Sequence, residues 1–118
     1  HRFELLHVAK AELRALAARG YRPPLSSNAI PVGGRTACAT FTAHLTNLLA
    51  GGHISEHDFR IATALARVMT GGDVDAGSLV DEQWLLDLER EALIGLLATE
   101  QTQARIEHTL KTGKPLRN

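Results

Sequence analysis

The segment EQWLLDLEREALIGLL, residues 82–97, constrains the fold of this 118-residue chain more than any other stretch. One set of its apolar residues is spaced by three and four positions, as on one face of a helix: Trp84, Leu85, Leu88, Ala92 and Leu96. A second face carries Leu86, Leu93 and Leu97. A helix that is apolar over most of its circumference is expected to lie between neighbours or against a partner. We therefore expect residues 82–97 to form the buried centre of a helical assembly.

Four further segments show helical spacing and recognisable helix ends. The residues predicted to cap helix N-termini are Thr36, Ser55, Asp81 and Thr99. The glycines predicted to end helices lie at positions 20, 51–52, 71–72 and 113. No run alternates with the period of two that marks a strand. The predicted fold class is all-α, with about five helices in an antiparallel, bundle-like arrangement, because short glycine-centred turns favour adjacent packing.

The chain divides into three parts. Residues 1–20 predict a first helix, residues 21–35 form a loop, and residues 36–118 form a helical domain. The loop contains three prolines and paired glycines, so it predicts no regular element. Because the chain begins with His1 rather than Met and enters helical sequence at once, we interpret it as a segment of a longer protein.

Charge and cysteine content argue against several classes of protein. The chain carries 13 basic and 13 acidic side chains, so we expect no nucleic acid and no anionic membrane as its main partner. No apolar run approaches the ~20 residues that a membrane span requires. Cys38 is the single cysteine, which excludes an internal disulfide and favours a reducing, cytoplasmic location.

Two candidate chemical sites carry little weight. His53 and His57 are four residues apart, but His53 precedes the predicted cap at Ser55, so the two rings need not share a helical turn as zinc motifs require. No histidine–aspartate pairing is evident around Cys38, and free cysteines usually behave as small core residues. We expect no metal ligand and no catalytic residue; the alternative of a small metalloenzyme using the two histidines would show stoichiometric zinc.

Acidic residues gather on the 82–97 segment: Glu82, Asp87, Glu89 and Glu91. Acid pairs can act as general acid and base. On a helix with arginines nearby, solvated or paired charges are far commoner. The glycine doublets lack the spacing and strand context of a phosphate-binding loop, so helix ends and turns explain them.

The last fourteen residues are locally basic. Arg105, Lys111, Lys114 and Arg117 stand against a single acid, Glu107. Such a tail can hold a phosphate-bearing ligand through charge-assisted contacts. It can equally be a solubilising end, or place favourable charge at the C-terminus of a helix.

Residues 82–118, EQWLLDLEREALIGLLATEQTQARIEHTLKTGKPLRN, resemble the C-terminal end of multifunctional fatty-acid β-oxidation enzymes. These enzymes join a 3-hydroxyacyl-CoA dehydrogenase to an enoyl-CoA hydratase of the crotonase type. The upstream pieces GYRPP, GGHISEHD and ARVMTGGDV resemble the same family, so the resemblance covers the chain from about residue 20 onward. Its most specific stretches are LDLERE and KTGKPLRN.

The resemblance implies a helical C-terminal region that follows the hydratase core, with residues 1–20 leading in from that core. The parent chain would hydrate 2-enoyl-CoA and oxidise 3-hydroxyacyl-CoA with NAD. The family's oxyanion hole, catalytic glutamates, dinucleotide-binding loop and His–Glu pair have no counterpart in these residues. The fragment is therefore expected to be non-catalytic, to hold no cofactor, and to serve packing, assembly and closure of the CoA site.

The resemblance also implies two contact residues. By position, Lys111 and Lys114 match the basic residues that approach CoA phosphates in crotonases, so it implies an acyl-CoA contact in addition to the rest of the parent chain. Long insertions such as residues 21–54 separate this type from simple crotonases. The main alternative is an independent helical protein-interaction module unrelated to CoA. The amount of apolar helix surface further predicts self-association.

Overall fold

The computed structural model describes residues 2–118. Within this range the chain forms five helices and one small antiparallel sheet of two strands, which confirms the predicted all-α class. None of these helices combines the length and the apolar character that crossing a membrane requires. In chain order the elements are α1 (Arg2–Ala18), β1 (Ile30–Pro31), α2 (Gly34–Ala50), α3 (Glu56–Met69), β2 (Leu79–Val80), α4 (Glu82–Leu97) and α5 (Glu100–Thr112).

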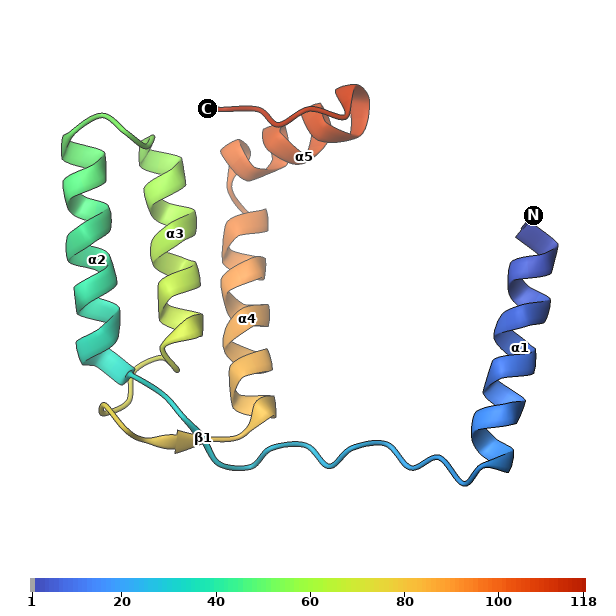
Figure 1. Cartoon of the computed structure of the whole chain (residues 1–118). Coiled ribbons are helices and arrows are strands. Elements are labelled where there is room, and N and C mark those ends of the chain that lie inside the picture. The colour runs from blue at the N-terminus through green and yellow to red at the C-terminus, as the bar shows by residue number, and fades with distance from the viewer. Residues whose placement is uncertain (1) are drawn as a thin grey trace.

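Helices α2, α3 and α4 stand side by side with alternating direction, and α5 crosses the upper end of α4 (Figure 1). Helix α1 lies apart from them, at the end of an extended stretch of chain, and all residues from 2 to 29 are exposed. The radius of gyration is 19.8 Å, whereas a compact domain of 118 residues has a value of about 13.5 Å. The molecule is therefore open, with one helix held away from the rest.

The central helix is α3 and not α4, which corrects the expectation from the sequence. Helix α3 packs against α2 on one side and α4 on the other. In α4 only Leu88 is buried, while Leu93 is 54% exposed and Ile94 is 60% exposed. The sequence correctly predicts an apolar circumference for α4, and α3 and α5 are the helices that pack most closely against it. Much of its apolar surface consequently faces solvent.

The best-packed region lies at the base of the bundle, where the chain leaves α3 and enters α4. Val32 is 7% exposed and packs so closely on Gly71 that a Cβ there would lie 2.5 Å from a Val32 methyl carbon. The Trp84 indole N–H donates to the Gly71 carbonyl at 2.9 Å. Leu88 packs on Gly72 less tightly, since a Cβ there would lie 3.1 Å from a Leu88 methyl carbon. Glycine at both positions lets side chains from two other segments approach the backbone.

The two-residue strands are a feature that the sequence did not predict. Residues 21–35 were expected to contain no regular element, yet Ile30 pairs with Val80 and Pro31 pairs with Leu79. The pairing continues beyond the strands, because Val32 N–H donates to the Ser78 carbonyl at 3.0 Å. Two residues are too few to show alternation in a sequence, so tertiary contacts alone define this ribbon.

Most predicted helix ends are confirmed. Ser55 and Asp58 form a reciprocal capping box, with each side chain accepting from the backbone N–H of the other at 3.0 Å. The side chains of Asp81 and Thr99 accept from the third residue after each of them. Gly113 has a φ of 69°, the left-handed conformation that ends α5. Local side-chain chemistry therefore sets these boundaries.

The predicted cap at Thr36 is wrong, because α2 begins at Gly34 with no side-chain cap. Here the boundary is set by contacts with the loop that follows α3. Gly34 has a φ of +61°, and its N–H donates to the Thr70 carbonyl at 2.8 Å. A Cβ at Gly34 would lie 2.3 Å from the Val74 carbonyl oxygen. A backbone-to-backbone contact of this kind leaves no signature in the sequence of α2.

Substitution of Gly34 with alanine should lower the free energy of unfolding by more than ~3 kcal/mol, because positive-φ strain adds to a clash with backbone atoms. Gly77→Ala is the matched control, since Gly77 has a φ of +82° and open space around its Cβ position. That control should lose only ~1–2 kcal/mol. Urea unfolding followed by circular dichroism measures both losses, and equal losses would contradict the close approach.

Candidate functional site

A polar junction joins the start of α3 to α5. The His57 side chain is 7% exposed, and its Nε2 lies 2.9 Å from Oγ1 of Thr102. Beside it, Nη2 of Arg105 lies 2.9 Å from Oδ1 of Asp58, with the Arg105 side chain only 22% exposed. The capping box at Ser55 holds the Asp58 carboxylate in place for this ion pair. These contacts fix the angle at which α5 crosses the bundle.

The C-terminal tail belongs to the same junction. It turns back after α5, so that Asn118 comes to lie at the start of α3 (Figure 1). The Arg105 guanidinium donates to the Asn118 side-chain oxygen at 2.6 Å and to its backbone oxygen at 3.0 Å. Ser55 Oγ donates to the same backbone oxygen at 2.9 Å. Arg105 thus binds α3 and the tail at once.

Electrostatics at this junction follow from burial and from hydrogen bonding. The hydrogen bond from the backbone N–H of Ser55 is the main cause that lowers the pKa of Asp58 below its ordinary value. The hydrogen bond from Arg105 lowers it further, because both stabilise the carboxylate. Burial lowers the pKa of His57, and the positive charges of Arg105 and Arg60 add to that effect. The junction therefore favours an ionised Asp58 and a neutral His57.

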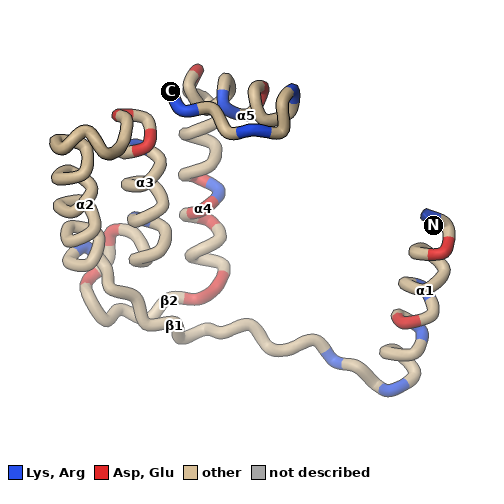
Figure 2. The backbone as a smooth tube through the Cα atoms, turned by 45° about the horizontal axis from the view of Figure 1, so that its top comes forward, with Lys and Arg blue, Asp and Glu red and all other residues tan. Residues whose placement is uncertain are grey.

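Lys111 and Lys114, the residues predicted to contact CoA, lie at the turn between α5 and the tail. Lys111 is in the last turn of α5, and its Nζ is 2.5 Å from a Glu107 carboxylate oxygen, with both side chains exposed. Lys114 follows Gly113, and the Lys114 carbonyl accepts from the hydroxyls of two threonines of α5. Figure 2 shows basic positions at this end of the molecule. Arg105, by contrast, faces inward to Asp58 and is separate from this exposed pair.

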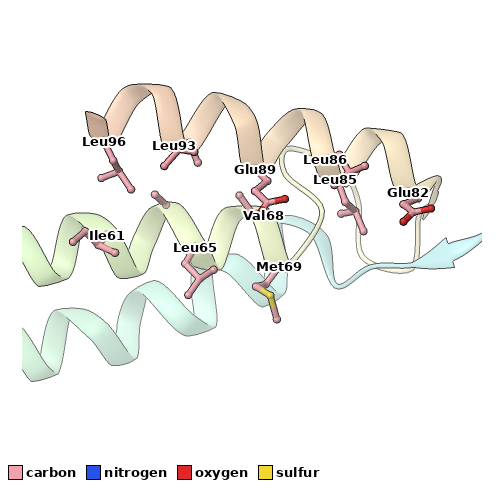
Figure 3. A pocket seen from close by; sticks show the side chains of 12 residues that line it. Ile61, Leu65, Val68, Met69, Glu82, Leu85, Leu86, Glu89, Leu93 and Leu96 are labelled. Carbon is pink, nitrogen blue, oxygen red and sulfur yellow. The ribbon is translucent and has the colours of Figure 1, made fainter. Parts of the chain in front are cut away.

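A long apolar groove runs between α3 and α4 and encloses about 600 Å³. We call it the α3–α4 groove, and Figure 3 shows the side chains that line it. They are Ile61, Ala64, Leu65, Val68, Met69, Glu82, Leu85, Leu86, Glu89, Ala92, Leu93 and Leu96. Leu65 and Met69 also line a smaller hollow between α2 and α3, where Phe41 is 54% exposed. The three helices therefore share one continuous apolar face.

The acidic cluster of α4 does not form one site. Glu82 and Glu89 line the α3–α4 groove, whereas Asp87 and Glu91 line a different hollow together with Arg67. The Glu91 carboxylate lies 3.7 Å from Nη1 of Arg67. Asp87 accepts from the Gln83 side chain at 2.8 Å. The four acids thus lie on two sides of the helix and do not form one acid–base pair, which agrees with a structural role.

The other sequence candidates are also placed apart. His57 is engaged with Thr102 inside the junction, while His53 lies exposed in the turn before the Ser55 cap. Cys38 is half-buried on α2. Within residues 2–118 no group of three or more His, Cys, Asp or Glu side chains gathers as a metal would require.

Two features escaped the sequence reasoning. Leu65 and Met69 form exposed walls of both apolar hollows, and their exposure depends on how α2 and α4 are placed against α3. Arg35 forms ion pairs with both Asp73 and Asp75 across the base of the bundle. The partners are separated by nearly forty residues, so no local spacing could have predicted either pair.

Stability should fall as the pH is lowered from about 7.5 to 5.5, and His57 should account for part of the loss. Its folded-state pKa is below the ordinary value of 6.5, so the unfolded chain takes up a proton first and stability is lost as the pH falls through that range. Urea unfolding at several pH values measures the slope. His57→Gln should flatten it, whereas the exposed control His53→Gln should not. Identical slopes for wild type and His57→Gln would refute this assignment.

Comparison with known proteins gives one informative relative. The chain is 44% identical over 114 residues to the probable 3-hydroxyacyl-CoA dehydrogenase of Bacillus subtilis (strain 168). The matched region is 97% of this chain but only 14% of that protein. No protein-family model matches the chain, and no solved structure matches it significantly.

The coverage of this match defines what it supports. It reaches upstream of residue 20 as well as over the segment that carries the resemblance, because 97% of the chain is aligned. It supports the dehydrogenase side of the resemblance, while the crotonase-type hydratase side stays a prediction. The chain is thus similar, over nearly all of its length, to a small part of a probable 3-hydroxyacyl-CoA dehydrogenase.

Proposed function

We propose that this chain is the helical C-terminal part of a fatty-acid β-oxidation enzyme whose longer chain oxidises 3-hydroxyacyl-CoA with NAD and hydrates 2-enoyl-CoA. The observation that carries the proposal is the 44% identity to a short part of a probable 3-hydroxyacyl-CoA dehydrogenase. The wide apolar face of α2, α3 and α4 supports it, since such faces mark surfaces that pack against a partner. Its role is packing and assembly, without catalysis of its own.

The described residues do not fit an NAD site. Dinucleotide sites use free backbone N–H groups at a glycine-rich turn between a strand and a helix. The turn here that comes nearest to this pattern lies between β1 and α2. Its Gly34 N–H donates to Thr70 and its Arg35 N–H donates to Val74, so both donors are already used. NAD would therefore be held by other parts of the longer chain.

A second role concerns CoA. Lys111 and Lys114 are exposed cations at the free end of α5, away from the polar junction that holds the helix. Charge-assisted contacts to phosphate oxygens are among the stronger hydrogen bonds of proteins. The two lysines would close over the phosphate-bearing end of an acyl-CoA bound by the rest of the enzyme. Binding of CoA would exchange the Lys111–Glu107 pair for a pair with phosphate.

The alternative is an independent helical interaction module unrelated to CoA. The α3–α4 groove favours it, because a helix-sized apolar groove is one of the recurring modes of peptide recognition. The two functions differ in what surrounds the chain in its gene. A preceding segment in the same reading frame that encodes a strand–GxGxxG–helix unit supports the first function. A start codon close to residue 1 supports the second.

The protein encoded by the complete reading frame that contains this chain should oxidise a 3-hydroxyacyl-CoA with reduction of NAD. The same protein should hydrate a 2-enoyl-CoA. Absorbance of NADH and of the enoyl thioester follows the two reactions separately. Loss of the dehydrogenase reaction after mutation of the encoded GxGxxG glycines provides the control. A complete protein that catalyses neither reaction would refute the proposed function.

Lys111→Ala/Lys114→Ala should weaken binding of CoA by about tenfold or more, because two charge-assisted contacts are lost. Glu107→Gln should strengthen binding, since it releases Lys111 from its ion pair. The double variant Lys10→Ala/Arg14→Ala on α1 removes the same charge far from the tail and should bind CoA as wild type does. Isothermal titration measures all four proteins. An unchanged affinity in the lysine double variant would rule out the contact.

A further inference from the structure

The chain exposes much more surface than a compact protein of its size. Its accessible surface is 9257 Å², whereas a compact monomer of 12.8 kDa exposes about 6,300 Å². The excess of about 3,000 Å² exceeds the ~800 Å² that each partner buries in a standard stable interface. Large apolar side chains account for part of it, on α1 and along the α3–α4 groove. These two surfaces are therefore candidates to bind each other.

Helix α1 carries the features of a groove-binding helix. Leu6, Leu13 and Leu16 share one face of the helix and form an apolar stripe, with Leu6 56% exposed and Leu13 67% exposed. Its seventeen residues span about 25 Å. The groove follows α4 from Glu82 to Leu96, a length of about 22 Å. Helix and groove therefore match in length and in apolar character, as helix-in-groove recognition requires.

Charge is complementary as well. Helical geometry places Lys10 and Arg14 together on one flank of the apolar stripe of α1. Glu82 and Glu89 lie in the lining of the α3–α4 groove, on the α4 side (Figure 3). None of these four side chains has an ion-pair partner within residues 2–118. Docking would pair two exposed cations with two exposed acids, which orients the helix in the groove.

The connection to α1 decides which copy of the groove it reaches. The Ser27 carbonyl accepts from the Glu82 N–H at 3.2 Å, so the connecting chain is anchored at the lower end of its own groove. From there residues 21–26 lead away from the bundle, and Pro23 and Pro24 stiffen them in extended form (Figure 1). Return to the same groove requires a reversal within this stiff stretch. Reaching a second molecule requires none.

We propose that the α3–α4 groove of one copy binds α1 of a second copy, and that the exchange is reciprocal in a symmetric dimer. Each molecule then provides one groove and one helix, which is the closed arrangement of an isologous interface. Two such contacts bury α1 and the walls of the groove together. This exchange depends on α1, α3 and α4 alone and is independent of the activity of the parent enzyme.

The mass of the 118-residue chain in light scattering tests the association. The wild type should be a dimer, and Leu6→Asp/Leu13→Asp should weaken it by about 100-fold or more, because charge replaces two apolar contacts. Ala11→Asp/Ala15→Asp adds the same charge to the opposite side of α1 and should leave the dimer intact. A monomer at high concentration would overturn the proposal, and so would a dimer that persists in the leucine variant.

Cross-linking distinguishes exchange from return to the same groove. In a Cys38→Ser background, one protein carries Ala9→Cys in the middle of α1, and another carries Leu65→Cys in the middle of the groove. After mixing, a short bismaleimide should join the two proteins in a 1:1 product. The double variant Ala9→Cys/Leu65→Cys provides the opposite test. Its cross-linking within single chains, with no product in the mixture, would show that α1 occupies its own groove and would refute the exchange.

Discussion

The close approach of Val32 and Leu88 to the backbone at Gly71 and Gly72 is the constraint on which the arrangement of the bundle depends. It joins the chain before α2, the end of α3 and the first turns of α4 at one point. The Trp84 indole adds a hydrogen bond to the Gly71 carbonyl. With these segments fixed at the base, α2 and α4 pack against opposite sides of α3, and the spacing of α3 and α4 leaves the α3–α4 groove.

Helix class and most helix ends followed from the sequence because they depend on local chemistry. The capping box at Ser55 and the left-handed Gly113 lie within a few residues of the groups they satisfy. The start of α2 at Gly34 and the ribbon at Ile30 did not follow, because each depends on a partner more than thirty residues away. Burial was misjudged for a related reason. Periodicity shows that a helix face is apolar, but it does not show whether a partner covers that face.

The candidate site likewise contains features that the sequence predicts and features that depend on distant partners. The family resemblance implied Lys111 and Lys114 as contacts to CoA phosphates, and both are exposed at the outer end of α5. The sequence could not show that Arg105, which is also basic, instead forms an ion pair with Asp58 and binds the C-terminal tail. The His57–Thr102 contact likewise joins residues that are 45 positions apart. The polar junction thus separates structural charge from charge that is available to a ligand.

The position of Trp84 has a practical consequence for spectroscopy. It is the single tryptophan of the chain, and it is half-exposed with its indole N–H bound to Gly71 at the base of the bundle. Its fluorescence therefore comes from one defined place, unmixed with emission from other indoles. A change in emission reports on the packing where α3 ends and α4 begins. The molecule carries a built-in optical probe for its best-packed region.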